Sequence, residues 1–537
     1  MNGRRTRSVV CLALGALLAA TGAANAKEEP KRGGILKFVV PDEPPSFDGH
    51  RETTFALIHP IAPFYSVLIR INPDNPASLT DFVCDLCTEV PKPVDGGKTY
   101  TFKIRKGVKF HDGSPLTAKD VEATFRHIVF PAEGVLSARK AQFSMIESIT
   151  SPDDETVVFK LKHPSGAFIP VLANPYNFVY SKAKLDQDPR WYEANVMGSG
   201  PFVFDKREAG ARVTGKANKN YYHKGLPYLD GFEAIFAKKQ SLRVQAIRGD
   251  QAAIEFRGFP PKSRDDLVRA LGKDITVQES DWNCGLVLTP NHSRKPFDDV
   301  RVRRALTLAL DRWGGSHDLS KIAIVKAAGG LVFPGHPLGM TKEELQKVAG
   351  YWPDIEKSRA EARRLLQEAG HPNLSFTFLN RATDQPYTIV GTWMIDQWKK
   401  VGISAKMRNE ATAGWFAGLR AGDFDVGVTA NCQSIVNPLL DVAYYLPTGR
   451  SGQQMGVFKD PELEKIYDSM IKLGDVAEQK ALMARFERRV MDEEAHNFQI
   501  FWWYRIIPHR SYLKGWKISP SHYLNQDLSG LWIDRDL

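Results

Sequence analysis

Residues 100–128 of this 537-residue chain combine a strand, a tight turn and a helix in direct succession. Apolar and polar side chains alternate for six residues from Tyr100, which is the period of a strand with one buried face. An Asp-Gly pair at 112–113 then favours a turn. Thr117, with Asp120 three residues on, is placed to cap a helix whose apolar side chains recur every three or four residues. Local physics therefore predicts a strand, a turn and a helix here.

The later part of the chain alternates strands and helices. Ser375–Leu379 and Ser404–Met407 have the pattern of strands, and Tyr387–Lys400 between them has the pattern of a helix, so the three form a predicted βαβ unit. Ser358–Ala369 is a further predicted helix, and Gly370 is well placed to end it. This alternation is typical of an α/β domain.

Several segments also contain distinctive sequence motifs, which follow one another along the chain. GVKFHDG at 107–113, P-x-T-A-x-D-V at 115–121 and KPFDDVRVRRALTLALDR at 295–312 resemble signatures of extracellular solute-binding protein family 5. Members of that family bind dipeptides and oligopeptides and supply ABC importers. GSGPF at 198–202 and NKNYYHKGLPYLDGF at 218–232 resemble two more of its segments. The resemblance implies an α/β fold: a two-lobed periplasmic-binding-protein clamp (type II, large peptide-binder class) with an extra inserted subdomain in lobe 1.

The same resemblance suggests how the chain is divided. We expect the first lobe to be discontinuous and to return after the second. The expected parts are a signal peptide at 1–26, lobe 1 at 27–55, an inserted subdomain of lobe 1 at 56–189, lobe 1 again at 190–262, lobe 2 at 263–489 and the last part of lobe 1 at 490–537.

The first 26 residues have the three parts of a secretory signal. Basic residues open the chain, Val9–Ala20 is apolar, and Ala24-Asn25-Ala26 has the small-x-small form of a cleavage site. The apolar run is shorter than the roughly twenty residues that cross a bilayer. Twin-arginine export and a lipid anchor at Cys11 fit the flanking residues poorly. We therefore expect cleavage before Lys27 and a periplasmic location.

Composition and motifs exclude several classes of protein. The formal net charge of +10 comes from charges of both signs spread along the chain, without the basic and aromatic stripe of a nucleic-acid-binding protein. Neither a nucleophile elbow, a Walker A loop, an H-E-x-x-H motif nor a Rossmann fingerprint occurs. His111 beside Asp112 is more typical of a structural turn than of a metal or acid-base site. We expect no catalytic residues, no metal and no cofactor.

Four cysteines follow the signal peptide. Cys84 and Cys87 lie in a polar, Pro-rich segment, where an oxidising compartment favours a small structural disulfide. Free thiols, or a metal or redox site, are the alternatives, although a thioredoxin-like context and a second ligand pair are both missing. Cys284 and Cys432 are too far apart in sequence for a pairing to be assigned.

Two candidate ligand-binding residues bear on specificity. In peptide-binding members of the family, lobe 2 supplies an Asp for the ligand's α-ammonium and often an Arg for its carboxylate. The segment Val428–Pro438 resembles the place of that Asp, and its nearest matching position here is Asn431. Losing the charge would weaken binding of an ammonium by about 1–2 kcal/mol. Arg381 is placed to bind a carboxylate with its forked donors, or else to pair with a surface acid.

The remaining candidates are mostly aromatic. Their positions resemble those of cleft residues in relatives, although each could equally belong to the core. They are Phe47 in the opening turn, Trp282 and Asn283, Trp415, and Trp502 with Tyr504. Strand alternation would put Trp502 and Tyr504 on one face and Trp503 on the other. Together these residues suggest a roomy, aromatic-lined pocket with few fixed charges.

These observations predict a binding protein that is not an enzyme. Hinge closure would capture a small solute, a peptide or peptide-like molecule, for delivery to the membrane permease of an ABC importer. The alternative ligands are an opine, a sugar derivative, an aromatic acid or a metal chelate. A periplasmic receptor or chaperone role is less well supported. We expect a monomer, since docking on a permease needs free lobe faces, and no nucleic-acid partner.

Overall fold

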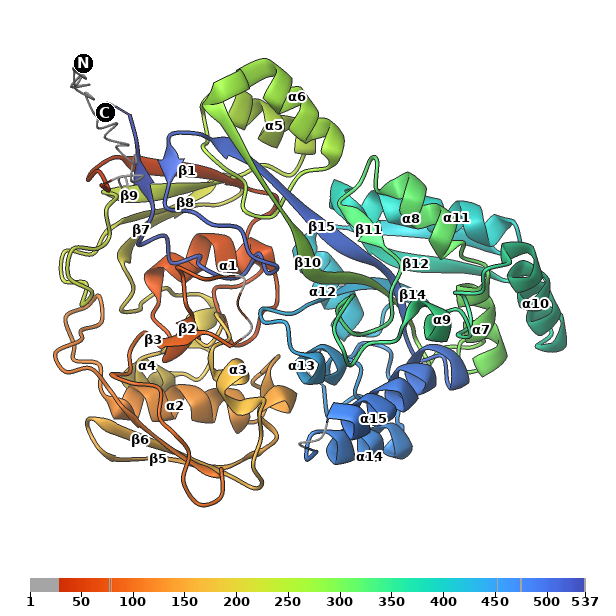
Figure 1. Ribbon diagram of the computed structural model, residues 1–537, viewed down its shortest axis with the longest axis horizontal. Coiled ribbons are helices and arrows are strands. Elements are labelled where there is room, and N and C mark those ends of the chain that lie inside the picture. The colour runs from red at the N-terminus through yellow and green to blue at the C-terminus, as the bar shows by residue number, and fades with distance from the viewer. Residues whose placement is uncertain (1–28, 77, 79, 452, 474–475, 536–537) are drawn as a thin grey trace, which may run out of the picture.

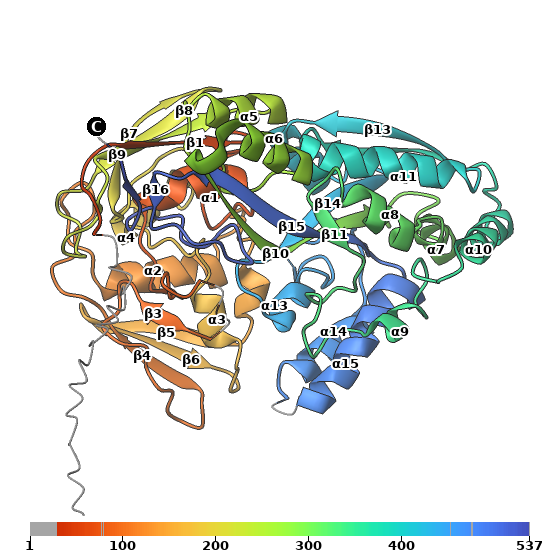
Figure 2. The same cartoon turned by 45° about the horizontal axis from the view of Figure 1, so that its top comes forward.

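Two lobes lie side by side in the structure, a computed structural model that describes residues 29–535 apart from 77, 79, 452 and 474–475 (Figure 1). Two long antiparallel strands, β10 (Ile275–Pro290) and β15 (Phe498–Arg510), run between the lobes. Figure 2 shows these strands side by side along their course from one lobe to the other. The predicted signal peptide, residues 1–26, lies outside the described residues. No helix in the described part of the chain is both long enough and apolar enough to cross a membrane.

The first lobe is built on a four-stranded sheet. Its order is β1 (Ile35–Val40), β9 (Gly231–Phe236), β8 (Arg212–Ala217) and β7 (Phe202–Glu208). β1 and β9 are parallel, and the other neighbours are antiparallel. Since β1 comes from the N-terminal segment and the other strands follow residue 200, the chain leaves this sheet and returns to it.

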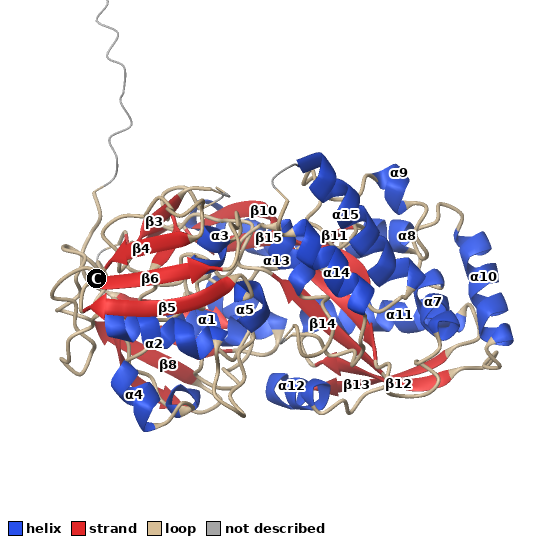
Figure 3. Ribbon diagram, turned by 90° about the horizontal axis from the view of Figure 1, so that it is seen from below, coloured by secondary structure: helices blue, strands red, loops and turns tan. Residues whose placement is uncertain are grey.

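A separate sheet lies in the segment between β1 and β7, which is called the excursion below. It has the order β4 (Thr99–Lys103), β6 (Thr156–Leu161) and β5 (Ile146–Asp153), and α2 (Ala118–Val129) packs along it (Figure 3). The predicted capping box is confirmed: Thr117 caps α2, and Asp120 accepts a hydrogen bond from the Thr117 backbone N–H. Smaller elements complete the unit: β2 (Ile69–Ile71), β3 (Phe82–Cys84), α3 (Phe168–Leu172) and α4 (Lys182–Gln187).

The boundary expected at residue 56 falls within a helix that packs in the first lobe. α1 (Phe55–Ile61) is fully buried and shares a core with β1 and β9 of the first lobe. The core of the excursion begins only at Leu68. The aromatic side chain of Tyr180, near the expected end of the insertion, also belongs to the first-lobe core.

A six-stranded mixed sheet forms the second lobe. Its order is β11 (Val325–Ala327), β15, β10, β14 (Val426–Cys432), β12 (Ser375–Arg381) and β13 (Ser404–Glu410). β12 and β13 are parallel and are joined through α11 (Ile389–Lys399), so the predicted βαβ unit is confirmed. The other helices are α7 (Val300–Leu308), α8 (Arg312–Leu319), α9 (Lys342–Leu345), α10 (Ile355–Glu368), α12 (Thr412–Arg420), α13 (Pro438–Ala443), α14 (Pro461–Met470) and α15 (Val476–Arg488).

The second boundary, expected at residue 263, falls within α6 (Pro261–Leu271). α5 (Gln240–Arg248) and α6 pack against each other above the junction of the lobes, with a small core of their own (Figure 1). The core of the second lobe begins at Trp282, within β10. After β15 the chain returns to the first lobe through β16 (Leu513–Lys514) and β17 (Trp532–Ile533).

Candidate functional site

A cavity lies between the two lobes, and residues from both form its wall. Its first-lobe lining comes from the segment before α1, from residues 136–138 and from residues 522–523. Its second-lobe lining comes from β12, α12, β14, β15 and the loops around α13. The lining residues are Arg51, Thr53, Thr54, Phe55, Leu136, Ala138, Arg381, Tyr387, Trp415, Phe416, Leu419, Arg420, Thr429, Ala430, Cys432, Tyr444, Gln453, Met455, Trp503, His522 and Tyr523.

The N-terminus of α1 positions the first-lobe wall. Thr54 is extended, and its hydroxyl accepts a hydrogen bond of 3.2 Å from the Ala56 N–H, which fixes the start of the helix. Phe55 follows as the first helical residue and is buried against the cavity. The Tyr523 hydroxyl donates to the Thr53 carbonyl over 3.2 Å and so joins the C-terminal segment to the same wall.

Arg381, the last residue of β12, crosses from the second lobe toward the first. Its side chain is buried, and its Nε and Nη2 donate to the Thr412 hydroxyl over 3.0 and 2.9 Å. Nη2 also donates to the Thr54 hydroxyl over 3.1 Å. The guanidinium lies 4.5 Å from the centre of the Phe55 ring and 5.3 Å from that of Trp415. The predicted alternative of a surface ion pair therefore does not describe this Arg.

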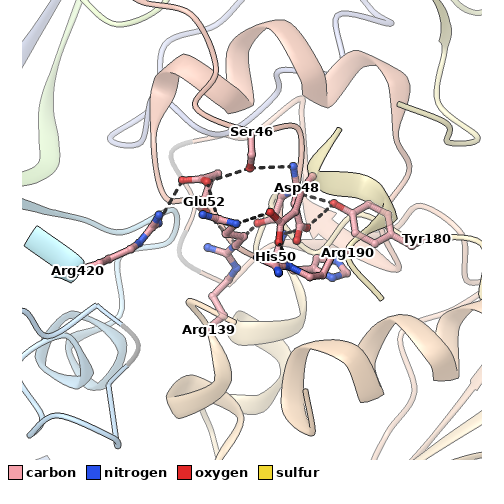
Figure 4. Close-up of polar contacts among 11 residues, drawn as sticks. Ser46, Asp48, His50, Glu52, Arg139, Tyr180, Arg190 and Arg420 are labelled. Carbon is pink, nitrogen blue, oxygen red and sulfur yellow. Dashed lines mark hydrogen bonds and ion pairs between the residues drawn. The ribbon is translucent and has the colours of Figure 1, made fainter. Parts of the chain in front are cut away.

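A second polar contact links the lobes beside the cavity. Arg420, at the end of α12, reaches the Glu52 carboxylate of the first lobe, with 3.4 Å between Nη2 and Oε2 (Figure 4). Glu52 is buried, and its carboxylate also accepts a hydrogen bond from the Ser46 hydroxyl and pairs with Arg51. Burial lowers the pKa of Arg420, and the neighbouring Glu52 opposes this effect.

The charged side chains of the cavity wall are all of one sign. Three arginines line the cavity, Arg51, Arg381 and Arg420, and no acidic residue among the described ones does. Glu52, which does not line the cavity, pairs with Arg51 and Arg420 and offsets their positive charge. Because Arg381 donates only to hydroxyls, the wall is net positive where it is most aromatic.

Two of the eight ligand-binding candidates from the sequence, Arg381 and Trp415, line this cavity. Trp415 lies on α12, and its indole N–H donates to the Val428 carbonyl over 3.1 Å, which fixes the ring against the strand behind it. The rest of the ring faces the Arg381 guanidinium. Whether either residue contacts a ligand stays a prediction.

The other six candidates lie elsewhere. Trp282 is fully buried, and its indole N–H donates to His522 over 2.8 Å. Asn283 donates from its amide to the Gln433 and Ile435 carbonyls. The Asn431 amide donates to the Asp441 carbonyl over 2.9 Å, and its oxygen accepts from Gln433.

The remaining three candidates are also not among the residues that line the cavity. Phe47 packs against Phe204 and Arg207 in the first lobe. The Trp502 indole N–H donates to the Gly330 carbonyl over 3.0 Å, and the Tyr504 hydroxyl donates to Glu279 on the outer surface.

Alternation along β15 places Trp503, instead of Trp502, at the cavity. The period of two was the right signal for opposite faces, but both faces of this strand are buried, so hydrophobicity did not mark the cavity side. Phe55, Tyr387 and Tyr523 were also missed, because each lies in a loop or at a helix end without a periodic pattern.

Both pairs of cysteines are joined. Cys84 forms a disulfide with Cys87, the pairing expected from the sequence. Cys284 forms a second one with Cys432, 148 residues away, because β10 and β14 place the two opposite each other. Cys432 lines the cavity, so the second disulfide anchors its wall.

The two lobes, the crossing strands and the shared cavity define a two-lobed solute-binding clamp. The chain belongs to the bacterial extracellular solute-binding proteins, family 5, whose middle-region model matches residues 81–453. This family consists of binding proteins, in agreement with the prediction that the chain is not an enzyme.

Curated relatives of the chain are named for peptides. Di/tripeptide-binding protein 1 of Pseudomonas aeruginosa is 29% identical over 58% of this chain, which spans 60% of that protein's length. The probable D,D-dipeptide-binding periplasmic protein DdpA of Escherichia coli is 24% identical over 85% of this chain and 86% of its own.

Solved structures share the fold. AgaA of A. tumefaciens R10, in complex with agropinic acid, matches with a TM-score of 0.82 and 23% identity over 94% of this chain and 99% of its own. DppA of Helicobacter pylori, in complex with the peptide STSA, matches with a TM-score of 0.79 and 20% identity over the same shares. The α/β fold is thus that of the large periplasmic binding proteins, as predicted.

Proposed function

We propose that this protein captures a small solute between its lobes and delivers it to the membrane permease of an ABC importer. The observation that carries the proposal is the cavity whose wall both lobes supply. A ligand in such a cavity contacts both lobes only when they are closed, so its binding shifts the open–closed equilibrium toward the closed form. The permease would then recognise the closed form.

A peptide or peptide-like solute is the first candidate. The names of several relatives, among them di/tripeptide- and glutathione-binding proteins, support this class. Arg381 would then bind the carboxylate of the peptide, and the aromatic side chains around it would contact the apolar groups.

A non-peptide solute, such as an opine, a sugar derivative, an aromatic acid or a metal chelate, is the second candidate. The composition of the wall favours it, because no carboxylate among its described residues is placed to pair with an α-ammonium. Asn431, which resembles the position of the ammonium-binding Asp in sequence, has its amide committed to Asp441 and Gln433. AgaA, solved with agropinic acid, has the same fold.

The same proposal includes the cellular location and the oligomeric state of the protein. We place the mature protein in the periplasm, as the name of the periplasmic relative DdpA suggests, and we expect it to act as a monomer whose lobe faces dock on the permease. A receptor or chaperone that uses the same clamp is the less favoured alternative.

A thermal-shift screen tests the proposal. Purified protein, refolded to remove bound solute, is mixed with di- to pentapeptides, opines, sugar acids, aromatic acids and metal chelates. A true ligand at one hundred times its dissociation constant stabilises the fold by about 2.7 kcal/mol. Large shifts with peptides support the first candidate, and shifts with a non-peptide alone support the second. A complete lack of stabilisation by all classes would contradict the proposal.

A further inference from the structure

Arg257 is a fully buried guanidinium without a hydrogen-bond acceptor among the described residues. It lies in the loop between α5 and α6, and all three of its nitrogens are without a partner there. Its contacts are to aromatic rings: the guanidinium carbon lies 4.7 Å from the centre of Phe55, 5.2 Å from Trp503 and 5.8 Å from Trp282. Phe55 and Trp503 are both part of the cavity wall, whereas Arg257 itself is not among the described residues that line the cavity.

The nearby acidic group does not neutralise Arg257. Glu255 is held by Arg243, with 2.8 Å between Nε and Oε2, and its other oxygen accepts from the Gly258 N–H over 3.2 Å. Arg505, a second buried guanidinium of this region, donates to the Ser519 and Phe256 carbonyls. Arg257 therefore differs from its buried neighbours, since they have partners and it does not.

Arg381, from the second lobe, contacts the same Phe55 ring as Arg257. Its guanidinium carbon lies 4.5 Å from the Phe55 ring centre, so the two arginines share one ring. Arg381 donates to the Thr54 and Thr412 hydroxyls, and Thr412 in turn donates to Asp42, which Lys238 also approaches. Both guanidinium groups are thus buried without a directly bonded carboxylate.

A further buried hydrogen-bond donor, without an acceptor in the described part of the chain, lies beside Arg257. The Trp503 indole nitrogen is buried and has no acceptor among the described residues. Burial, with a smaller contribution from the charge of Arg381, lowers the pKa of Arg257 to about 10 against the opposing effects of Tyr387 and Glu255. Taking two like charges out of water is unfavourable unless an opposite charge joins them.

We propose that Arg257 and Arg381 form one acid-binding site, in which the anionic group of the solute supplies the negative charge that both guanidinium groups lack. This inference rests on the proposed function and narrows it to small organic acids. A carboxylate or a phosphate fits equally, because both accept forked hydrogen bonds from Arg. The aromatic rings around the site favour a planar or apolar remainder, and the solute needs no free ammonium group.

The first arm of the test needs no ligand. Arg257→Met and Arg505→Met each replace a buried guanidinium by an apolar side chain of similar length. We expect Arg257→Met to leave the melting temperature of the ligand-free protein unchanged or higher, because it removes a charge without partners. Arg505→Met should lower it, because it leaves the buried Phe256 carbonyl without its donor and removes one of the two donors of the Ser519 carbonyl. If Arg257→Met destabilises the protein as much as Arg505→Met does, Arg257 is a structural residue and the inference is overturned.

The second arm measures affinity by calorimetry. The probes are phenylacetate, N-acetylphenylalanine and phenyl phosphate, with phenylacetamide and N-acetylphenylalanine amide as uncharged counterparts. We expect the acids that bind to do so at least about tenfold more tightly than their amides, and Arg257→Met and Arg381→Met each to remove at least about tenfold of that affinity. Preference for the phosphate over the carboxylates would distinguish the two anions. Equal binding of acid and amide, or unchanged affinity in Arg257→Met, would overturn the inference.

The two arms separate this inference from the proposed function. A wild-type protein that binds amides or cationic peptides as tightly as acids would retain its function as a solute-binding protein, and only the acid-binding site would be wrong. A protein that binds none of these probes and none of the solutes of the thermal-shift screen would contradict the proposed function. The melting temperatures of Arg257→Met and Arg505→Met would then decide the role of Arg257 by themselves.

Discussion

The Arg381 Nη2 of the second lobe donates a hydrogen bond of 3.1 Å to the Thr54 hydroxyl of the first. The same hydroxyl accepts from the Ala56 N–H and caps α1. One side chain therefore fixes the local structure of the first lobe and joins it to the second. Since both partners line the cavity, the contact between the lobes and the shape of the cavity are coupled at this point.

Replacing Thr54 tests this coupling. Thr54→Val removes the hydroxyl, so we expect about 1 kcal/mol lower stability from the lost cap. We also expect roughly tenfold weaker solute binding, because the closed form loses a hydrogen bond to a charged group. Urea unfolding and calorimetry measure the two effects. Thr54→Ser, which keeps the hydroxyl, is the matched control and should resemble the wild type. Wild-type affinity in Thr54→Val would show that closure does not depend on this bond.

Trp502 and Trp503 allow a matched comparison, because each Trp→Phe change removes one indole N–H. Trp502→Phe deprives the Gly330 carbonyl of its donor and should lower stability by about 1 kcal/mol without changing affinity. Trp503→Phe removes a buried N–H without an acceptor, so stability should hold while affinity for an acidic solute falls several-fold. Calorimetry measures the affinity of each variant, and urea unfolding measures its stability. An affinity loss in Trp502→Phe equal to that in Trp503→Phe would contradict the assignment of their faces.

The two disulfides should differ in their contribution to stability. The chain-entropy relation predicts about 5 kcal/mol for Cys284–Cys432, which closes 148 residues, and about 2 kcal/mol for Cys84–Cys87, which closes 3. We expect the Cys284→Ala, Cys432→Ala double variant to unfold at markedly lower urea concentration than the Cys84→Ala, Cys87→Ala variant. Because Cys432 lines the cavity, the first variant should also bind solute more weakly. Equal midpoints would argue against the pairing of β10 with β14 through this bond.

Ionisation of Glu487 should lower the free energy of unfolding as the pH rises. Its carboxyl is buried in the second lobe and accepts from the Leu331 and Val332 N–H groups. Burial raises its pKa from 4.5 to about 7. The folded state therefore retains a proton that the unfolded state loses, so this contribution is fully present below about pH 4.5 and is lost as pH rises to 7, at about 1.4 kcal/mol per pH unit.

The Glu487→Gln variant isolates this effect, since it keeps an oxygen for the two N–H groups and cannot ionise. We expect its stability to fall less steeply than that of the wild type between pH 5 and 7, with the two curves parallel above pH 8. Urea unfolding across that range measures the difference. Parallel curves throughout would mean that Glu487 titrates normally in the folded protein.

Local elements of the fold were predictable because their signals lie within a few residues of each other. The capping box of Thr117 and Asp120 and the βαβ unit from Ser375 onward follow from spacing alone. The position of Arg381 at the end of a predicted strand was also sufficient to place it near the cavity.

The rest of the site depends on contacts between distant segments. Nothing local marks Arg257 in the sequence AIEFRGF as buried, because the rings that enclose it come from positions 55, 282 and 503. The partner of Cys284 is fixed only by the register of β10 on β14. The positive wall was missed for the same reason, since Arg51 and Arg420 come from different lobes.

Small-angle X-ray scattering of the refolded wild-type protein, with and without the acid that stabilises it most in the thermal-shift screen, tests the central claim most directly. We predict that saturating acid reduces the radius of gyration as the lobes close, and that the same concentration leaves Arg381→Met unchanged. A wild-type protein that calorimetry shows to be saturated, but whose scattering is identical with and without the acid, would contradict capture between the lobes.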